Sequence, residues 1–254
     1  MSGIRDRARR LLDLHRDGPV LVMPTVWDAW SARAVAAAGF AALSVGSAPL
    51  AASRGASDKE GMTLDDALDG VRRICAAVDV PVSADMESGY GAPPDELVQR
   101  LLEAGAVGLN VEDTVHGDGG RVRSPDEHAA YIGGLRAATD AAGIDVVINA
   151  RTDAFVHGAA VYDDPLDEAI RRLAACVDAG ARCVYPVKIP DAASLSTLMD
   201  RVDAPVNVLA NPRTGSSAGS IEQLRAAGVR RVTFGPMLQA ELTADLAALA
   251  APWA

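Results

Sequence analysis

Acidic side chains recur at the ends of short apolar runs in this sequence. Asp85 ends the run Val80–Asp85 and is followed by Glu87, while Glu112 ends the run Gly108–Glu112. Carboxylates that converge without basic partners repel one another, and each has its pKa raised. A hard divalent cation relieves that repulsion, and an all-oxygen ligand set favours Mg²⁺ or Mn²⁺ over Zn²⁺. These carboxylates therefore predict a magnesium or manganese site, provided that the two runs end side by side.

Basic and small polar residues end three further runs. Arg151 and Lys188 each follow one run, and Gly46 and Ser47 follow another. A guanidinium there stabilises an oxygen on which negative charge develops, and backbone N–H groups at a Gly-Ser turn hold a carboxylate. Each position also has a structural interpretation, with Arg151 as an ion-pair partner of the carboxylates and Gly46-Ser47 as a tight bend.

The elements that must position these residues alternate along the chain. Nearly continuous apolar runs indicate parallel strands buried on both faces, and the Ala-rich segments between them have helical periodicity. The predicted strands are Val20–Pro24, Ala41–Val45, Val80–Asp85, Gly108–Glu112, Val146–Ala150, Cys183–Val187, Val206–Ala210 and Arg231–Phe234. The predicted helices are Trp27–Ala38, Leu64–Val78, Pro94–Ala104, Pro125–Ala142, Leu166–Ala179, Ala192–Val202, Ile221–Ala227 and Gln239–Ala250.

Eight such alternations predict an α/β fold, a single (β/α)8 TIM barrel of parallel strands that spans residues 1–254 as one catalytic domain. A doubly wound open sheet is the alternative, but its GxGxxG fingerprint is missing after the first run. In a barrel the carboxyl ends of the strands build the active site, so the acidic and basic residues above are expected to converge.

Helix punctuation supports the same alternation. Gly39, Gly105, Gly180 and Gly228 stand where predicted helices end, and glycine tolerates the left-handed conformation that closes a helix. The segment Ser124–Glu127 has the pattern of a capping box with proline at the first helical position.

Composition narrows the classes of function. The chain has 24 Lys and Arg against 34 Asp and Glu, a net charge of −10, and only 4% aromatic residues, which argues against nucleic acid as a partner. No apolar stretch is long enough for a membrane span, and the charged start predicts an amphipathic helix rather than a secretory signal. Cys75, Cys176 and Cys183 form no CxxC pair and are read as core residues, which favours a reducing, cytoplasmic location.

Four motifs resemble the isocitrate lyase/phosphoenolpyruvate mutase superfamily. The resemblance extends from about Pro24 to Gly235, and together the motifs are specific for the superfamily but not for one member. The motifs are DMESGYG (Asp85–Gly91), VEDT (Val111–Thr114), NARTDAF (Asn149–Phe155) and SVGSAPLAASRGASDKEG, which ends at Gly61.

The resemblance implies a Mg²⁺-dependent barrel that makes or breaks a C–C or C–P bond beside a carboxylate, through an enolate intermediate. Carried over by position, the metal residues are Asp85 as direct ligand and Glu87, Glu112 and Asp58 as holders of metal-bound water. Arg151 is expected to stabilise the oxygen that becomes charged. The residues expected around the substrate are Gly46 and Ser47 at its carboxylate and Asn211 at its distal part. Homodimers or homotetramers are usual in the superfamily.

Departures from the superfamily pattern bear on the reaction. Lyase members carry a KKCGH-type loop whose Cys is the general acid, whereas His116–Arg123 has no Cys and is too short for the mutase-type gating loop. His116 is a substitute acid or simply a mobile loop histidine, and Asp58 lies in a loop that can close over the site. Lys188 stands where lyase members place a glutamate, so the substrate is expected to be smaller or differently charged than a tricarboxylate. Trp27 is expected either to wall the pocket or to pack on the barrel top.

These observations predict a lyase that cleaves a C–C bond, less favourably a C–P bond, of a small 2-oxo or 2-hydroxy carboxylic acid. The catalytic residues are then Arg151, Asp58 and His116. Three alternatives remain open: a phosphonopyruvate/phosphoenolpyruvate mutase-type enzyme, a Schiff-base aldolase that uses a buried Lys188, and a barrel without catalytic activity.

Overall fold

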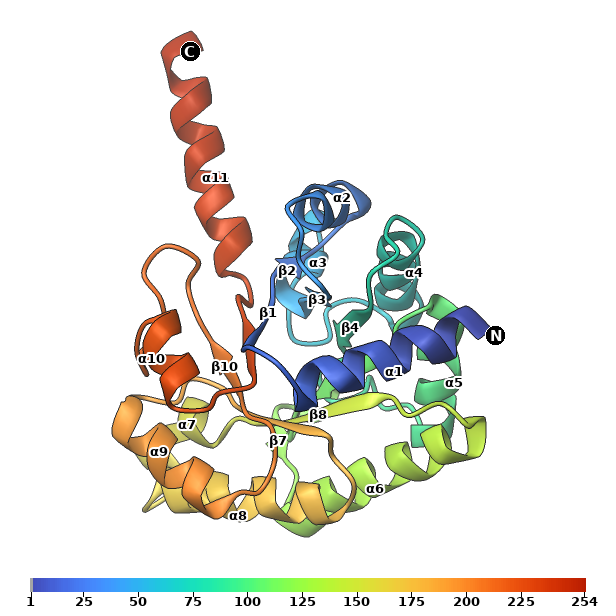
Figure 1. Cartoon of the computed structure of the whole chain (residues 1–254), viewed down its shortest axis with the longest axis vertical. Coiled ribbons are helices and arrows are strands. Elements are labelled where there is room, and N and C mark those ends of the chain that lie inside the picture. Colours follow the sequence, from blue (N-terminus) through green and yellow to red (C-terminus); the bar gives the residue numbers. More distant parts are fainter. Residues whose placement is uncertain (1) are drawn as a thin grey trace.

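Strands from the whole length of the chain form one parallel barrel (Figure 1). The computed structural model describes residues 2–254. Six strands pair in the order β2-β3-β4-β5-β8-β9, and three more in the order β1-β11-β10. A parallel bridge between Val184 and Val206 joins the two sets on one side, and Pro24 alone separates β1 from β2 on the other. The sheet therefore closes on itself, and the predicted α/β barrel is confirmed.

The strands fall where the apolar runs predicted them. Their bounds are β1 (Leu21–Met23), β2 (Thr25–Val26), β3 (Leu43–Val45), β4 (Val82–Asp85), β5 (Gly108–Val111), β8 (Val147–Thr152), β9 (Cys183–Pro186), β10 (Asn207–Leu209) and β11 (Arg231–Thr233). β1 and β2 are one barrel strand interrupted by proline, which lacks the N–H that a ladder needs. Because β8 runs on to Thr152, Arg151 lies within a strand rather than after one.

Each predicted helix has a counterpart, and two short α-helices and one hairpin of strands appear that were not predicted. The helices are α1 (Ser2–Arg16), α2 (Ala29–Ala37), α3 (Ser47–Ser53), α4 (Leu64–Cys75), α5 (Pro94–Ala104), α6 (Pro125–Ala142), α7 (Ala154–His157), α8 (Pro165–Asp178), α9 (Ala192–Arg201), α10 (Ile221–Ala226) and α11 (Met237–Ala250). The short helices α3 and α7 and the antiparallel hairpin of β6 (Thr114–Val115) and β7 (Arg121–Val122) are too brief to give a periodic signal. All three border the carboxyl ends of barrel strands.

Helix ends follow the predicted chemistry. The Ser124 side chain accepts from the Glu127 N–H while the Glu127 side chain accepts from the Ser124 N–H, so the capping box is present. The glycines expected to close helices all have left-handed backbone, with φ of 92° at Gly39, 94° at Gly105, 104° at Gly180 and 88° at Gly228. Residues with a Cβ adopt this conformation only at a cost.

The two ends of the barrel are treated differently. Helix α1 covers the amino-terminal end, where Leu11 is fully buried and packs near Gly108 at the start of β5. Helix α11 leaves the opposite side and projects away from the barrel (Figure 1). Among its residues, Leu242, Leu246 and Leu249 are exposed, and none is buried. Within residues 2–254, no helix is long and apolar enough to cross a bilayer.

Candidate active site

A cavity of about 250 Å³ opens at the carboxyl ends of the barrel strands. We call it the site cavity. Six residues that the sequence singled out line it: Gly46, Ser47, Asp58, Asp85, Arg151 and Lys188. Further lining comes from Ser44 of β3, Asn110 of β5, Tyr185 of β9 and Thr233 of β11. The barrel therefore brings together chemistry-bearing residues that lie up to 142 positions apart, from Gly46 to Lys188.

Asp85 is the last residue of β4 and faces the site cavity beside its strand neighbour Asn110. Its Oδ2 accepts from the Ser47 hydroxyl at 3.4 Å, and its Oδ1 accepts from the Glu87 N–H at 3.3 Å. Burial raises the pKa of Asp85, and the Arg151 guanidinium, 3.9 Å away, opposes that rise. The carboxylate thus has few donors of its own and lacks a close counter-charge.

Glu87 is held inward by an unusual backbone. Its φ is +48° and its side chain is buried, with Oε1 accepting from the Tyr90 hydroxyl at 2.9 Å. Oε2 accepts from the Glu60 N–H at 2.5 Å. Burial, with the negative charge of Asp85 as the next cause, raises the pKa of Glu87 to about 8. Ionising this group in the folded protein therefore calls for a nearby cation.

Glu112 joins the loop histidine to the arginine. Its Oε1 lies 2.6 Å from His116 Nε2, and its Oε2 lies 2.5 Å from Arg151 Nη1. Burial raises the pKa of Glu112 to about 7 in spite of the Arg151 charge. The hydrogen bond that His116 makes to the Glu112 carboxylate raises the pKa of His116 in turn. His116 is therefore held on Glu112 rather than free in a mobile loop, although Glu87, Glu112 and His116 lie behind Asp85 and Arg151 and do not themselves line the site cavity.

Arg151 is aimed by a chain of hydrogen bonds behind it. Its Nε lies 2.8 Å from Asp153 Oδ1, and Asp153 Oδ2 accepts from the Thr114 hydroxyl at 2.9 Å. The same hydroxyl lies 3.0 Å from His157 Nε2. Burial works against the charge of Arg151, but Glu112, Asp153 and Asp85 outweigh it and raise the pKa. The guanidinium stays charged and fixed in direction.

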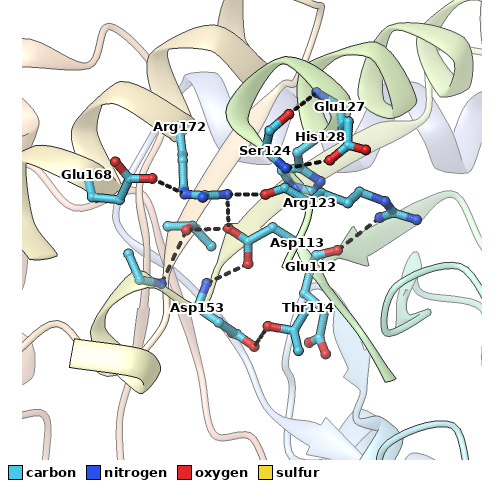
Figure 2. Close-up of polar contacts among 12 residues, drawn as sticks. Glu112, Asp113, Thr114, Arg123, Ser124, Glu127, His128, Asp153, Glu168 and Arg172 are labelled. Carbon is cyan, nitrogen blue, oxygen red and sulfur yellow. Dashed lines mark hydrogen bonds and ion pairs between the residues drawn. The ribbon is translucent and has the colours of Figure 1, made fainter. Parts of the chain in front are cut away.

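A buried ion-pair network connects helix α8 to the ends of strands β5 and β8 (Figure 2). Asp113 is fully buried, and it accepts from the Asp153 N–H at 2.9 Å and from Arg172 Nη1 at 3.2 Å. Arg172 also donates to the Arg123 carbonyl at 2.7 Å and pairs with Glu168 at 2.6 Å. This arrangement ties helix α8 to the residues that follow β5 and β8.

Arg123 extends the network to the hairpin (Figure 2). Its guanidinium donates to the carbonyl of Glu112 at 3.2 Å and to that of Ser88 at 2.8 Å. It also lies over the ring of Tyr131, 4.3 Å from the ring centre, which is a favourable cation–π contact. The turn after Glu87 and the carboxyl end of β5 are thereby held together.

The residues present fit a divalent cation. Glu87, Glu112 and His116 each offer one ligand atom, and these three atoms lie within 4.8 Å of one another. Buried carboxylates whose pKa values are raised by burial and by their neighbours are the donor set that such a cation stabilises. The imidazole adds a nitrogen donor, which the oxygen-only prediction did not include.

The remaining predicted site residues differ in whether they reach the site cavity. Asp58 is exposed at the cavity rim. Gly46 precedes α3, and a Cβ there would lie 2.7 Å from Thr25 Cγ2, so only glycine fits. The Asn211 side chain donates to Glu241 at 2.8 Å and accepts from the Arg213 N–H at 2.7 Å, outside the site cavity. Trp27 lines a separate cavity with Trp30 and residues of α11.

The exposure of Lys188 contradicts the Schiff-base aldolase alternative. Its side chain is exposed at the rim of the site cavity, whereas the Schiff-base interpretation required a buried lysine. An amine attacks a carbonyl only when deprotonated, and burial is the usual means of removing the proton. Its φ of +59° places it at the third position of a turn closed by the Ile189 N–H and the Pro186 carbonyl.

Several residues of the site were missed by sequence reasoning. Glu60, Asp153 and Arg172 each bond to a predicted site residue or its neighbour, and Tyr185 lines the cavity. Asp153 lies within the quoted NARTDAF motif, so its charge two residues after Arg151 was an available signal. Arg172 lies in a helix where charged residues are common, and nothing in the sequence set it apart.

Comparison with known proteins agrees with this geometry. The profile of the phosphoenolpyruvate phosphomutase family matches residues 11–252. The chain belongs to this family. It is 32% identical to 2-methylisocitrate lyase of Escherichia coli K12 over 233 residues, 87% of this chain and 75% of that protein. The resemblance stated from the motifs is thus confirmed.

Two solved structures extend the comparison. A Burkholderia cenocepacia J2315 protein described as a candidate phosphonomutase is 37% identical, with a TM-score of 0.86 over 96% of this chain and 98% of that chain. Oxaloacetate acetylhydrolase with its product oxalate is 27% identical, with a TM-score of 0.83 over 94% of this chain and 83% of that chain. The family thus includes proteins named for C–C and for phosphonate chemistry.

Proposed function

We propose that this family member is a divalent-metal-dependent lyase that cleaves a C–C bond of a small 2-oxo or 2-hydroxy carboxylic acid through an enolate. One observation carries the proposal: buried Glu87 and Glu112 meet Asp85, Arg151 and His116 at the mouth of a parallel barrel. The similarity to proteins named 2-methylisocitrate lyase and oxaloacetate acetylhydrolase supports the C–C assignment.

The metal is Mg²⁺ or Mn²⁺ in this proposal. Asp85, Glu87, Glu112 and Asp58 would hold it, directly or through water. When bound, such an ion supplies positive charge to the oxygens of a carboxylate and an adjacent enolate.

The side chains of the site each have a defined task. Arg151, held by Asp153, presents a fixed cation to the oxygen that gains charge. The N–H groups at Gly46 and Ser47 lie at the start of α3 and receive the substrate carboxylate. His116 replaces the absent cysteine as proton donor to the departing carbon, and Asp58 closes the rim.

Mutase-type chemistry is the second candidate, because the phosphonomutase-like structure covers almost the whole chain at 37% identity. The two reactions differ in the fate of phosphorus. Incubation with phosphonopyruvate and detection by ³¹P NMR would show a new phosphate ester or free phosphate if this alternative holds. A spectrum that stays unchanged, together with cleavage of a 2-hydroxy acid, supports the lyase.

The test of the proposed function is calorimetric titration of oxalate in the presence of Mg²⁺, Mn²⁺ or chelator. Oxalate is a planar dianion that imitates the enolate of pyruvate. We expect binding that needs metal and that disappears in Asp85→Ala. Oxalate that fails to bind in the presence of either metal would overturn the metal–enolate proposal.

The chain's cellular setting and assembly are proposed on separate observations. We infer a cytoplasmic enzyme, because Cys75, Cys176 and Cys183 are all unpaired. We also infer that residues 1–254 act as one catalytic domain. We infer a homodimer or homotetramer because α11 exposes Leu246 and Leu249, at 68% and 73% of their surfaces. Light scattering should give a dimer or tetramer mass, and Leu246→Glu should lower it.

A further inference from the structure

Glu60 connects three segments around the site cavity. It lies in the loop between α3 and α4, where its backbone N–H donates to Glu87 Oε2 at 2.5 Å. Its carboxylate Oε1 accepts from the Ser88 hydroxyl and from the Tyr90 N–H, the latter at 3.1 Å. Its Oε2 accepts from the Gly117 N–H at 2.8 Å. One side chain thus ties the Asp58 loop, the turn after β4 and the hairpin that carries His116.

Most residues other than glycine that have a strained, left-handed backbone lie around Glu60. Within residues 2–254, five residues other than glycine have positive φ. Four of them meet here: Lys59 at 64°, Glu60 at 58°, Glu87 at 48° and Tyr90 at 55°. Strained backbone of this kind persists only where surrounding contacts outweigh its cost, and it concentrates at functional sites.

The hydrogen bonds that outweigh this strain centre on Glu60. Glu60 bonds to Glu87 and to Tyr90, and the Tyr90 hydroxyl bonds to Glu87. Without the Glu60 carboxylate, nothing in these contacts holds the loop against the hairpin at Gly117. The loop is then expected to relax to ordinary backbone and to release the Glu87 oxygen.

We propose that Glu60 is a positioning residue for the metal site. It closes the Asp58 loop, holds Glu87 inward and sets the hairpin so that His116 faces Glu112. It does not touch the substrate. The inference rests on the proposed function, since it assigns Glu60 a task at the proposed metal site.

Proteolysis can report loop closure without any enzyme assay. Lys59 and Lys188 are the two lysines of the whole sequence, so a lysine-specific protease has two cleavage positions. Cleavage after Lys59 requires the loop to leave its closed position, whereas cleavage after Lys188 monitors the rest of the barrel. Lys59→Arg identifies the loop product, because it removes that cleavage position alone.

We expect Glu60→Ala to be cut after Lys59 at least tenfold faster than the wild-type protein, with cleavage after Lys188 unchanged. Glu60→Gln keeps one carbonyl oxygen and should fall between the two. Rates on matching short peptides correct for the altered residue next to Lys59. Glu103→Gln, an exposed glutamate on α5, is the matched control and should behave as wild type.

Manganese binding tests the positioning role directly. Titration of Mn²⁺ alone, followed by electron paramagnetic resonance, should show about tenfold weaker binding for Glu60→Ala and a smaller loss for Glu60→Gln. Faster loop cleavage with unchanged Mn²⁺ affinity would overturn the positioning role, as would a cleavage rate equal to wild type. If Glu60→Ala is also cut faster at Lys188, its fold is perturbed and Glu60→Gln decides.

The two proposals fail in different ways. A wild-type protein that binds neither Mn²⁺ nor Mg²⁺ contradicts the proposed function, and the Lys59 cleavage contrast still shows whether Glu60 closes the loop. A wild-type protein that binds Mn²⁺ and oxalate, with no change in Glu60→Ala, keeps the proposed function and removes Glu60 from it.

Discussion

The two halves of the barrel mouth are built on different principles. On the half formed by β4, β5 and β8, charged side chains bond to one another, and Glu112, Asp113 and Arg172 are buried. On the half formed by β9, β10 and β11, a second cavity of about 520 Å³ adjoins the site cavity. We call it the distal cavity. Its lining includes Lys188, Ser216 and Met237 but no carboxylate.

This difference separates fixed chemistry from adjustable fit. Ion pairs that are buried and hydrogen-bonded hold their members in one geometry, which a reaction centre requires. The distal half is held by bonds of the loop after β10, such as that from the Asn211 N–H to the Gly215 carbonyl at 2.8 Å, and by the exposed pairs of Arg213 with Glu241 and Asp245, none of which involves the buried carboxylates. Side chains there can change without disturbing the carboxylates. We therefore expect variants of the first half to lose stability or rate, and variants of the second to alter substrate affinity.

The largest effect is expected from Arg172→Met. It leaves Asp113 buried and without its ion-pair partner, and breaking a buried pair in this way typically costs about 3–5 kcal/mol. The measurement is urea unfolding followed by circular dichroism. Arg171→Met is the matched control, because Arg171 lies next in sequence but forms an exposed pair with Glu168, worth about 0–1 kcal/mol. Equal losses for both variants would remove the distinction between the two halves.

Arg151→Met should abolish most activity, and it should also cost stability, because it leaves buried Glu112 and Asp153 without their cation. Removing one preorganised group that meets developing charge typically lowers kcat by about 10²–10³-fold. Arg151→Lys should recover only part of the loss, because an ammonium cannot bond to Glu112 and Asp153 in the same planar fork. Steady-state kinetics on the cleaved acid gives the values. A loss confined to KM would mean that Arg151 only binds substrate.

The stability of the metal-free protein should depend on pH with a definite sign. Burial raises the pKa of Glu87 to about 8 and of Glu112 to about 7, well above their values in an unfolded chain. The folded state therefore binds more protons, and its stability is lost as the pH rises through 7 to 8. Added Mn²⁺ or Mg²⁺ should restore the loss at high pH, because it favours the ionised carboxylates.

Thermal unfolding at pH 6 and pH 8.5 checks this expectation. Each kcal/mol corresponds to about 2–4 °C in Tm for a chain of this size. The metal-free wild type should melt at the lower temperature at pH 8.5, and Glu87→Gln should reduce the difference. A metal-free protein that is more stable at pH 8.5, with Glu87→Gln unchanged, would contradict the assigned direction.

The sequence predicted the barrel because its signals were local and repeated. Apolar runs and helix-ending glycines such as Gly105 recur along the chain, and the strand ends follow directly from them. The proposed metal residues Asp85, Glu87 and Glu112 could be named for the same reason, since each stands at a strand end or within two residues of one. Hydrogen-bond partners chosen by tertiary packing were not accessible in this way.

Glu60 and Arg172 illustrate what the sequence does not encode locally. Glu60 bonds to Gly117, 57 residues away, and Arg172 reaches Asp113, 59 residues away, so neither role follows from spacing. The direction of α11 was also beyond sequence reasoning. The sequence predicted a helix there but not that the whole of α11 projects from the barrel. Its orientation depends on the turn at Gly235, which has a φ of +51°.

The smallest effect is expected from Lys188→Met, and it tests the distal half directly. Within residues 2–254 no ion pair forms on Lys188, which lines both the site cavity and the distal cavity. For a substrate with a second carboxylate we expect about a tenfold rise in KM, equivalent to ~1.4 kcal/mol, with kcat changed less than twofold. Metal-dependent oxalate binding should be unchanged.

Arg213→Met, which removes a nearby cation already paired with Glu241 and Asp245, should leave KM unaffected. A large fall in kcat for Lys188→Met would instead place Lys188 in the chemistry and erase the contrast between the two halves.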